Sequence, residues 1–563
     1  MGSIGELSNR HTASIASILS TDGGFPNDHI FSTFMLRCRN AGSRVAFHEP
    51  DNRVSATFDQ FMTDIIHQGH HLRKHLLPYL DEHGILEDSF PICVLSTANY
   101  EFSIAAMAIL ALGGLVVPLP LDSSGAFVSN TLRQAPTKML LAGQRYVHEA
   151  TKIQHFASAE SLPSVTLLPI DSLHDSPANL WGILDAGINT EFSISESRPG
   201  ITLFTSGSTG SPKGVVHSRG WFPKLPQAPA DEAVLVHRPP SWLGGCLFLF
   251  TAIMTASRAE IVDPGASLRY TWERIRRDGI TYINSGCGWW EQMVRFYKAE
   301  LQNHPQKEEY LAGIGGVRSA FTGSSVAVPS LLQFLSGEFK LRLHMTYGTT
   351  EVGRILLGVP LEELKRSDRY LGRPLFLDMP LKLSEGDKGE LLVGGMRTFI
   401  GYLNGEPSTE GLFDEDGYFR TGDIAHRQHD CYVFDGRVSI DFIKNAGEKV
   451  PVIELEQVIR GLDYVTEAYV VPVKDNVLGS RLGVLLKSKG EKITLNSLRA
   501  DLASKVGSHM LPNTFCLMAE NERVPKTPTD KVSKSDLVKV FFPDCAEQGL
   551  HDRVELLDIE IPT

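Results

Sequence analysis

Apolar residues in the first part of the chain alternate between helical and extended spacing. From Phe58 to His83 they recur at mostly helical spacing, which predicts an amphipathic helix that stops near Gly84. Shorter apolar runs follow, and they predict in turn a strand, a buried helix and a second strand, over residues 90–95, 102–111 and 115–118. A strand, a helix and a strand in this order form the βαβ unit of a parallel sheet.

The same alternation continues along the next two hundred or so residues. Residues 175–199 interrupt it with a polar, irregular stretch that predicts a surface connection. The further helices are expected at 127–135, 267–278 and 289–296, the further strands at 138–141 and 280–283, and a strand, turn, apolar helix and strand within 233–262.

Beyond Gly436 the pattern changes to short alternating segments and charged helices, such as a helix at 453–460 and a strand at 465–473. The sequence therefore predicts an α/β protein with a large N-terminal domain of βαβ-rich sheets, residues 1–437, and a small C-terminal α+β domain, residues 438–563. A chain of 563 residues also exceeds what one hydrophobic core usually supports.

The composition and net charge limit the classes of molecule that the chain is expected to bind. With 42% hydrophobic and 21% charged residues, the chain has the composition of an ordinary globular protein. The formal charge is −12 and no Lys/Arg block stands out, which argues against nucleic acid or an anionic membrane as a main partner. An anionic ligand would need a local basic site, which Lys213, Arg437 and Lys531 could supply.

The cysteines and the ends of the chain bear on its compartment. The seven cysteines are odd in number and lack CxxC spacing, which predicts free thiols in a reducing compartment. The first ten residues have no apolar core and so predict no secretory signal. The most hydrophobic run, residues 102–118, is shorter than the roughly 20 residues that a membrane span needs. We expect a cytoplasmic protein without a membrane span.

The segment from Phe204 to Gly214 is rich in glycine and hydroxyl-bearing residues and contains Lys213. Glycines let backbone N–H groups approach an anion, hydroxyls add donors and the lysine adds a positive charge, so the segment suits phosphate. It is not a Walker A loop, because Pro212 stands where the second glycine belongs and Gly214 follows the lysine. A Gly/Ser-rich surface turn is the alternative reading.

Residues 205–218, TSGSTGSPKGVVHS, resemble the signature loop of the adenylate-forming superfamily, which contains acyl-CoA synthetases, adenylation domains and luciferases. Within the superfamily, residues 318–351 are most similar to short-chain and malonyl-type acyl-CoA synthetases. Further matches follow in the family's order at 347–351, 389–402, 418–423, 436–437 and 526–531. The resemblance implies a mobile C-terminal lid that follows the Gly436-Arg437 pair, with ATP, Mg²⁺ and coenzyme A as reactants or cofactors.

The resemblance also implies roles for the matching residues. Glu351 would serve magnesium, Thr350 would touch the α-phosphate and Tyr347, beside Gly348, would stack on adenine. Lys531 would bridge the reacting carboxylate and the α-phosphate. The β- and γ-phosphates would be held by Thr205, Ser206, Gly207, Ser208, Thr209, Gly210 and Lys213; the adenine would run along Gly323, Ser324 and Ser325; and the ribose would be bound by Asp423 near Arg437.

The C-terminal part departs from the family pattern at two points. Asp530 replaces the usual glycine before Lys531, and the segment after Arg437 is one residue longer than expected. This segment is where the lid should pivot, so its rotation is open to question. Gly447 and Lys449 remain candidates for the pantetheine tunnel.

The acid should bind among residues near the predicted strand ends at 236–245 and 284–289 and after Glu351. Arg238 or Arg354 could pair with a second carboxylate of the acid, but either could equally be a surface charge or part of a structural ion pair. The sequence does not identify the acid. The pocket candidates are Arg238, Trp242, Gly244, Ser285, Cys287, Trp289 and Arg354.

Three functions fit these residues. The first is an acyl-CoA synthetase that forms an acyl-adenylate and then a coenzyme A thioester. The second is an adenylation enzyme that loads a carrier protein in trans, since no carrier domain is evident in the sequence. The third is a non-catalytic nucleotide-binding paralogue, which the altered hinge suggests but the presence of Lys213, Glu351 and Lys531 disfavours.

Overall fold

The computed structural model divides the chain into two compact units, residues 1–368 with 395–412 and residues 369–394 with 413–563. The structure describes residues 18, 25–26, 28–121, 125–160, 162, 164–174, 177, 180–186, 188–189, 193–205, 213–225, 228–323, 329–360, 370–376, 379–395, 399–405, 411–437, 442–445, 448–475, 479–490, 492–526, 532–543 and 553–557.

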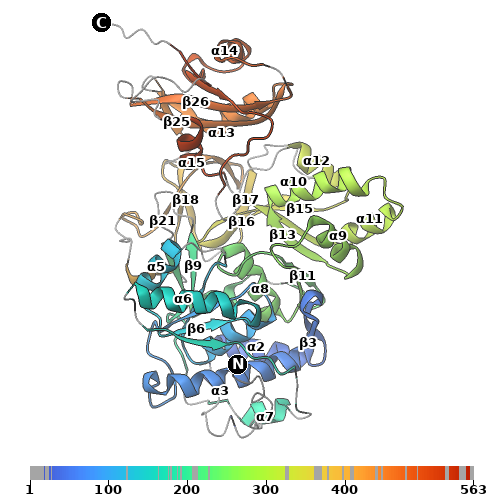
Figure 1. Ribbon diagram of the computed structural model, residues 1–563, viewed down its shortest axis with the longest axis vertical. Helices are drawn as coiled ribbons and strands as arrows, with labels where there is room; N and C mark the ends of the chain where they lie inside the picture. The colour runs from blue at the N-terminus through green and yellow to red at the C-terminus, as the bar shows by residue number, and fades with distance from the viewer. Residues whose placement is uncertain are drawn as a thin grey trace, which may run out of the picture. The chain divides into compact units, whose positions relative to one another are not determined.

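The first unit contains a sheet in which parallel strands are joined by helices, as the βαβ rhythm predicts (Figure 1). Its central strands pair in parallel through registers such as Cys93 with Val117 and Leu140. The strand order is β20 (Phe399–Tyr402), β10 (Lys213–Ser218), β9 (Pro199–Thr205), β5 (Leu115–Pro118), β4 (Pro91–Leu95), β6 (Met139–Ala142) and β7 (Thr166–Pro169), with α4 (Tyr100–Ala111), α5 (Gly125–Gln134) and α6 (Val147–Ala159) between strands.

A second sheet in this unit carries the remaining strand ends that matter for the site. Strands β13, β14 and β15 are parallel, and β15 then turns back into antiparallel β16. The order in this unit is β16 (Gly353–Pro360), β15 (Leu343–Thr349), β14 (Ser319–Gly323), β13 (Tyr282–Gly286), β11 (Ala233–Val236), β12 (Arg258–Ile261), β2 (Val45–Glu49) and β3 (Val54–Thr57).

The two faces of this second sheet pack against different cores. Helix α8 (Leu243–Thr255) is apolar almost all round, so it is buried on every side, and it joins Val234, Val236 and Tyr282 in one core with α4 and α3 (Phe58–Leu76). The opposite face, with Leu235 and Ile283, packs against α9 (Leu268–Arg277), α10 (Cys287–Phe296), α11 (Lys307–Gly315) and α12 (Pro329–Gly337) (Figure 1).

The second unit is α+β, with antiparallel strands and short helices. One antiparallel group is β18 (Leu381–Leu383), β19 (Lys388–Val393), β21 (Phe419–Gln428), β22 (Cys431–Arg437) and β17 (Tyr370–Pro374). A second sheet comprises β25 (Val465–Asp475), β26 (Gly479–Ser488), β27 (Thr514–Leu517) and β28 (Val554–Leu556), with α13 (Val452–Arg460), α14 (Leu495–Leu502) and α15 (Lys534–Phe541).

Most predicted elements are confirmed within one to three residues of their ends, and the large α/β plus smaller α+β architecture is confirmed. The long helix is an exception, since α3 ends at Leu76 and a 3₁₀ turn that contains Pro78 follows. The predicted irregular stretch 175–199 contains a short helix, α7 (Leu180–Ala186), which the surrounding polar residues hid. The domain boundary at residues 437 and 438 stays a prediction.

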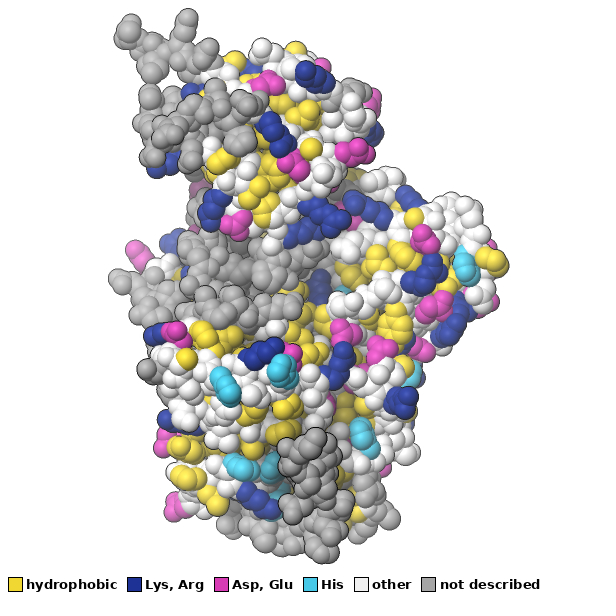
Figure 2. Space-filling model, in the orientation of Figure 1, with side chains coloured by type: hydrophobic (Ala, Val, Ile, Leu, Met, Phe, Trp, Pro, Cys, Tyr) yellow, Lys and Arg dark blue, Asp and Glu magenta, His cyan; other side chains and the backbone are white. Residues whose placement is uncertain are grey.

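Charges of both signs are interspersed over the described residues of the face seen in Figure 2. Among the described helices, none combines the length and the apolar character that crossing a bilayer would require.

Candidate active site

The glycine-rich segment is held between two paired strands. Strand β9 ends at Thr205 and strand β10 begins at Lys213, and these two residues lie directly opposite each other in an antiparallel register. Strand β10 follows the segment, whereas a Walker A loop would be followed by a helix. This confirms the prediction that the segment is not a Walker A loop. The predicted phosphate ligands Ser206, Gly207, Ser208, Thr209 and Gly210 lie outside the described residues.

Glu351 stands at the tip of a β-hairpin. Strands β15 and β16 pair through Thr349 with Gly353 and Gly348 with Arg354, so Thr350 and Glu351 lie in the tight turn between them. A Cβ atom at Gly348 would lie 1.9 Å from the carbonyl oxygen of Gly353, so this strand pairing requires glycine there. The hairpin therefore fixes where the carboxylate of Glu351 is presented.

Lys213, Tyr402 and Glu351 form a connected set of side chains. The Lys213 ammonium lies 5.6 Å from the centre of the Tyr402 ring, and the Tyr402 hydroxyl donates to Oε1 of Glu351 at 3.2 Å. Burial, together with the carboxylate of Glu351, raises the pKa of the Tyr402 phenol, which keeps it protonated as a donor. Strand β20 brings Tyr402 beside β10, opposite Val215.

A second contact ties strand β10 to the same hairpin. Nε2 of His217 bonds to the backbone carbonyl of Thr350 at 2.7 Å, and the imidazole stacks on Trp221 with ring centres 5.6 Å apart. His217 is fully buried and lies on the same face of β10 as Lys213, because strand residues alternate. One strand thus positions both the lysine and the backbone of the 347–351 motif.

Neither Tyr402 nor His217 was assigned a role from the sequence. Tyr402 lies within the 389–402 family match and His217 within the 205–218 match, so both belong to segments that the resemblance identifies. The signal that assigns them is a pairing register, and register between distant segments is not encoded by local spacing.

The residues near Glu351 fit a magnesium ion. Its Oε1 accepts from Tyr402, while Oε2 has no hydrogen bond to the described residues. An available carboxylate oxygen is the kind of ligand that Mg²⁺ prefers. Tyr347 and Thr350 are partly accessible beside it.

Three parallel strand ends lie next to this hairpin. Gly286 of β13 is in register with Gly323 of β14, and Gly323 with Thr346 of β15, one residue before Tyr347. Ligands in open α/β sheets bind outside the carboxyl ends of such strands. Ser324 and Ser325, predicted along the adenine, lie outside the described residues.

Arg238, Gly244 and Ser285 come together at one of these strand ends. Nη2 of Arg238 donates to Oγ of Ser285 at 3.4 Å, and a Cβ atom at Gly244 would lie 2.6 Å from Nη1. Burial lowers the pKa of Arg238 to about 10, yet the side chain is partly accessible. Arg238 therefore lies at the start of α8, between Gly244 and Ser285.

The other pocket candidates divide between the two faces of the sheet. Trp242 caps the start of α8 and is partly accessible. Cys287 is buried in the opposite core, with Sγ 3.3 Å from Oγ1 of Thr322. Trp289 packs on that opposite core with its ring tilted against His237, the ring centres 4.8 Å apart, and burial together with Arg238 lowers the pKa of His237 to about 3.

Arg354 projects from β16 toward the α8 face. Its guanidinium carbon lies 5.2 Å from the centre of the Phe321 ring, and its Nε and Nη1 are buried without a hydrogen-bond partner. Burial raises the pKa of the neighbouring Tyr282 phenol, and the positive charge of Arg354 partly offsets this rise.

In the second unit, Asp423 and Arg437 are partners in the β21–β22 ladder, which brings together the two residues predicted near the ribose. The Asp423 side chain is buried, and its backbone N–H donates to Oγ1 of Thr421 at 3.1 Å. Nothing is described of the Arg437 side chain.

The remaining candidates of the second unit belong to two segments whose flanking residues pair with each other. Strand β23 (Phe442–Asn445) pairs with β24 (Glu448–Pro451), where Lys449 opposes Lys444; Gly447 and the Lys449 side chain are outside the described residues. Lys526 bridges to Val532, which brings together the two ends of the segment containing Lys531, itself outside the described residues.

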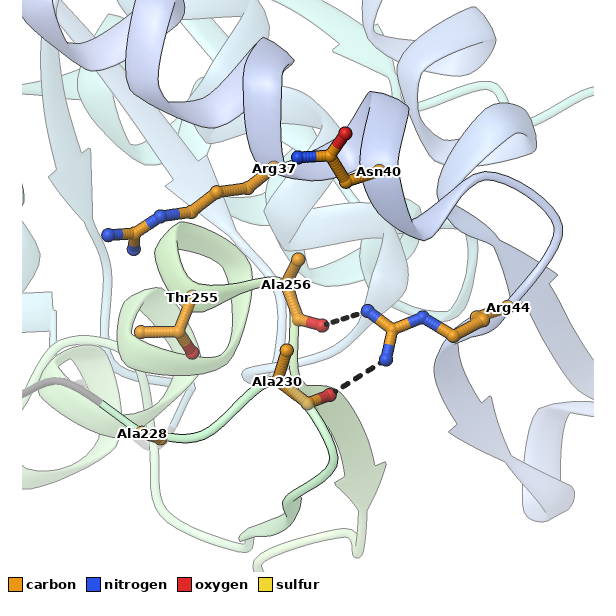
Figure 3. A pocket seen from close by; sticks show the side chains of 7 residues that line it. All are labelled: Arg37, Asn40, Arg44, Ala228, Ala230, Thr255 and Ala256. Carbon is orange, nitrogen blue, oxygen red and sulfur yellow. Dashed lines mark hydrogen bonds between the residues drawn. The ribbon is translucent and has the colours of Figure 1, made fainter.

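Two other polar clusters of the first unit serve the fold. A cavity of about 300 Å³ is lined by Arg44, whose guanidinium donates to the carbonyls of Ala230 and Ala256 at 3.0 and 3.1 Å and so joins loop ends (Figure 3). His48, Glu260 and Asp278 come close enough for a metal, but Arg274 already pairs with both carboxylates.

Comparison with known proteins agrees with these motifs. A model of the AMP-binding enzyme family matches residues 29–403, and a model of the AMP-binding enzyme C-terminal domain matches residues 454–531. The chain is 27% identical to the acyl-CoA ligase oryP of Aspergillus oryzae, over 95% of this chain and 96% of the relative. It is 24% identical to the mitochondrial malonate–CoA ligase of Bos taurus, over 80% and 81%.

A solved structure shares the fold. ATP-bound MatB from Rhodopseudomonas palustris superposes with a TM-score of 0.72 at 17% identity, over 91% of this chain and 99% of that one. The family match covers most of the described first unit, including the β9–β10 hairpin and Glu351. The resemblance stated from the sequence is confirmed, and the chain belongs to the AMP-binding enzyme family of adenylate-forming proteins.

Proposed function

We propose that this chain is an AMP-forming acid–thiol ligase, which activates a carboxylic acid with ATP and transfers the acyl group to coenzyme A. The observation that carries the proposal is the connected set of Lys213, Tyr402 and Glu351, which places a cation and an available carboxylate oxygen beside Thr350. The family match and the acyl-CoA ligase relatives support the same activity.

In the first step, a carboxylate oxygen of the acid attacks the α-phosphorus of ATP, and the bond to the β-phosphate breaks to release pyrophosphate. Both reactants are anions, so the rate depends on positioning and on fixed positive potential. Lys213 and the donors of the 205–210 loop would hold the leaving phosphates, and Lys531 would hold the carboxylate against the α-phosphate. Magnesium, bound through Glu351, would neutralise charge on the triphosphate.

In the second step, the sulfur of coenzyme A attacks the acyl carbon of the adenylate, AMP leaves and the thiol proton is lost to solvent. We place coenzyme A near Gly447 and Lys449 and the ribose of the nucleotide at Asp423 and Arg437. Residues 438–563 would act as the lid that changes position between the two steps, with Arg437 at its start. The β21–β22 pairing of Asp423 with Arg437 supports the ribose assignment.

The test is acid-dependent exchange of labelled pyrophosphate into ATP, followed by a search for thioester after adding coenzyme A. We expect exchange with at least one carboxylic acid and thioester with coenzyme A. If no acid supports exchange, the ligase proposal is rejected in favour of a non-catalytic nucleotide-binding paralogue. Exchange followed by acylation of a carrier protein but not of coenzyme A would identify the enzyme as a carrier-loading one.

We propose the cytosol as the site of this activity. The six cysteines in the described residues are all buried free thiols, which suits a reducing compartment.

A further inference from the structure

Arg238 and Arg354 lie on the same face of the second sheet, the face that α8 covers. Arg238 follows strand β11 and approaches Gly244 of α8, while the guanidinium of Arg354 lies over the ring of Phe321, which packs against the core containing α8. Within the described part of the chain, neither guanidinium forms an ion pair with a carboxylate. Two cations thus lie on this side of the sheet without a carboxylate partner among the described residues.

Arg238 forms little hydrogen bonding with the described residues. Its hydrogen bond to Oγ of Ser285 is long at 3.4 Å, and the side chain is partly accessible. Cβ atoms at Gly244 and Gly286 would lie 2.6 and 2.9 Å from its two terminal nitrogens. Any side chain at these two positions would cover the guanidinium edge, so the glycines keep space beside it.

Arg354 contacts the Phe321 ring and hydrogen-bonds with the Tyr282 side chain, but two of its nitrogens lack a partner. The guanidinium carbon lies 5.2 Å from the centre of the Phe321 ring, a cation–π contact that satisfies none of the N–H groups. Nε and Nη1 find no acceptor although both are buried. A buried donor without a partner costs free energy, which a ligand carboxylate would recover after a small rotation of the side chain.

The two arginines lie near strand ends that neighbour the Glu351 hairpin, where we place the reaction. Gly286, beside Arg238, is two strands away from Thr346, which is roughly 10 Å at ordinary strand spacing. Arg354 is paired with Gly348 of the hairpin that presents Glu351. An acid whose carboxyl group reaches the α-phosphate near Thr350 would extend along the ends of strands β13 to β15 toward Arg238.

We propose that the acid activated by this enzyme carries a second carboxylate, that Arg238 binds this group and that Arg354 contributes a further positive charge to it. The inference rests on the proposed function, since it names the substrate class of the same site. Guanidinium groups bind carboxylates through two parallel hydrogen bonds, so the site would select dicarboxylic over monocarboxylic acids of the same length.

The test compares matched acids by pyrophosphate release from ATP. The dicarboxylic series is malonate, glutarate, adipate and suberate, and the monocarboxylic series is propionate, pentanoate, hexanoate and octanoate, with the monomethyl esters of the diacids as analogues without the second charge. We expect the best diacid to exceed its monoacid and its ester by at least about 100-fold in kcat/KM, since a site built for a polar group rejects an analogue without it.

The variants Arg238→Met and Arg354→Met assign the effect to these residues. Each should lower kcat/KM for the best diacid by about 10- to 100-fold, mainly through the KM of the acid, and leave the KM values of ATP and coenzyme A unchanged. Arg354→Lys and Arg238→Lys should recover part of the loss. Arg295→Met, which removes a guanidinium that is 82% exposed on α10, is the matched control and should change nothing.

The outcomes separate the two proposals. Pyrophosphate release with monoacids as efficient as with diacids would overturn this inference and leave the ligase function standing. A preference for diacids that both arginine variants retain, or a rise in the KM of ATP or coenzyme A in place of the acid, would overturn the assignment to Arg238 and Arg354. Release with no acid of either series would overturn this inference, whereas the proposed function falls only if no carboxylic acid supports pyrophosphate exchange.

Discussion

Arg219 and Arg238 show two uses of a guanidinium in the same unit. Arg219 is fully buried, pairs with Asp28 through Nε at 3.1 Å and through Nη2, and donates through Nη1 to the carbonyl of Leu110 at 2.9 Å. Arg238 has a single long hydrogen bond and no described carboxylate partner. The chain itself supplies the anion for Arg219. For Arg238 we propose that the acid substrate supplies it.

Lys213 and Glu351 resemble Arg238, because neither has an oppositely charged partner among the described residues. Lys213 contacts an aromatic ring, and Glu351 accepts one hydrogen bond from a neutral hydroxyl. Neither forms an ion pair with another described residue, although both are partly buried near each other. The comparison predicts that changes at Arg219 and Asp28 affect stability, whereas changes at Lys213 and Glu351 affect catalysis.

The largest effect is expected from Asp28→Asn. Removing the carboxylate leaves the charge of Arg219 buried without compensation, so the free energy of unfolding should fall by about 3–5 kcal/mol. Urea denaturation measures it. The double variant Asp28→Leu with Arg219→Met removes both charges and should recover most of this loss. A double variant as unstable as Asp28→Asn would show that the ion pair does not account for the effect.

Lys213→Ala should slow adenylation by about 10²- to 10³-fold, because the cation acts on charge that moves to the leaving phosphates. Pyrophosphate exchange measures the rate, and the denaturation curve should match that of the native sequence. Lys224→Ala, at an exposed position a short distance along the chain, is the matched control. Adenylation within a few-fold of the native rate would place Lys213 outside the reaction.

Glu351→Gln should raise the magnesium concentration for half-maximal activity by about tenfold, since an amide oxygen is a weaker ligand than a carboxylate. Titration of activity with MgCl₂ at saturating ATP measures this. Glu415→Gln, an exposed glutamate of the second unit, should leave the titration unchanged. An unshifted curve for Glu351→Gln would remove this residue from the metal site.

The smallest effect is expected from Tyr402→Phe. The ring beside Lys213 stays, and only the hydroxyl that donates to Glu351 is lost, so adenylation should fall by about three- to tenfold. Tyr469→Phe removes a hydroxyl that donates to Glu467 at 2.8 Å in the second unit and is the chemical control. Equal rates for both variants would show that the Tyr402 hydroxyl has no part in positioning Glu351.

Local features of the fold could be predicted from the sequence. Helix α8 and the strand–helix–strand order around α4 are set by residues that are close together in the chain. The spacing of hydrophobic residues therefore predicts these elements directly. The helix α7 was missed because it is short and lies within a polar stretch. The early end of α3 followed from Pro78, a local signal that the periodicity outweighed.

The site could be predicted as a set of motifs but not as an arrangement. Glu351 and Lys213 were identified from family motifs, whereas their link through Tyr402 depends on the register of β20 against β10. The division of Arg238 from Trp289 onto opposite faces of the sheet likewise depends on which core each packs against. Both facts are set by contacts between distant segments, and local spacing carries little information about them.

The most direct test of the account follows one oxygen atom. When the acid is supplied with oxygen-18 in its carboxyl group and the reaction is run with ATP, Mg²⁺ and coenzyme A, attack on the α-phosphorus predicts AMP that carries one labelled oxygen and pyrophosphate that carries none. AMP without label, or label in pyrophosphate or orthophosphate, would contradict the claim that this chain joins an acid to the α-phosphate.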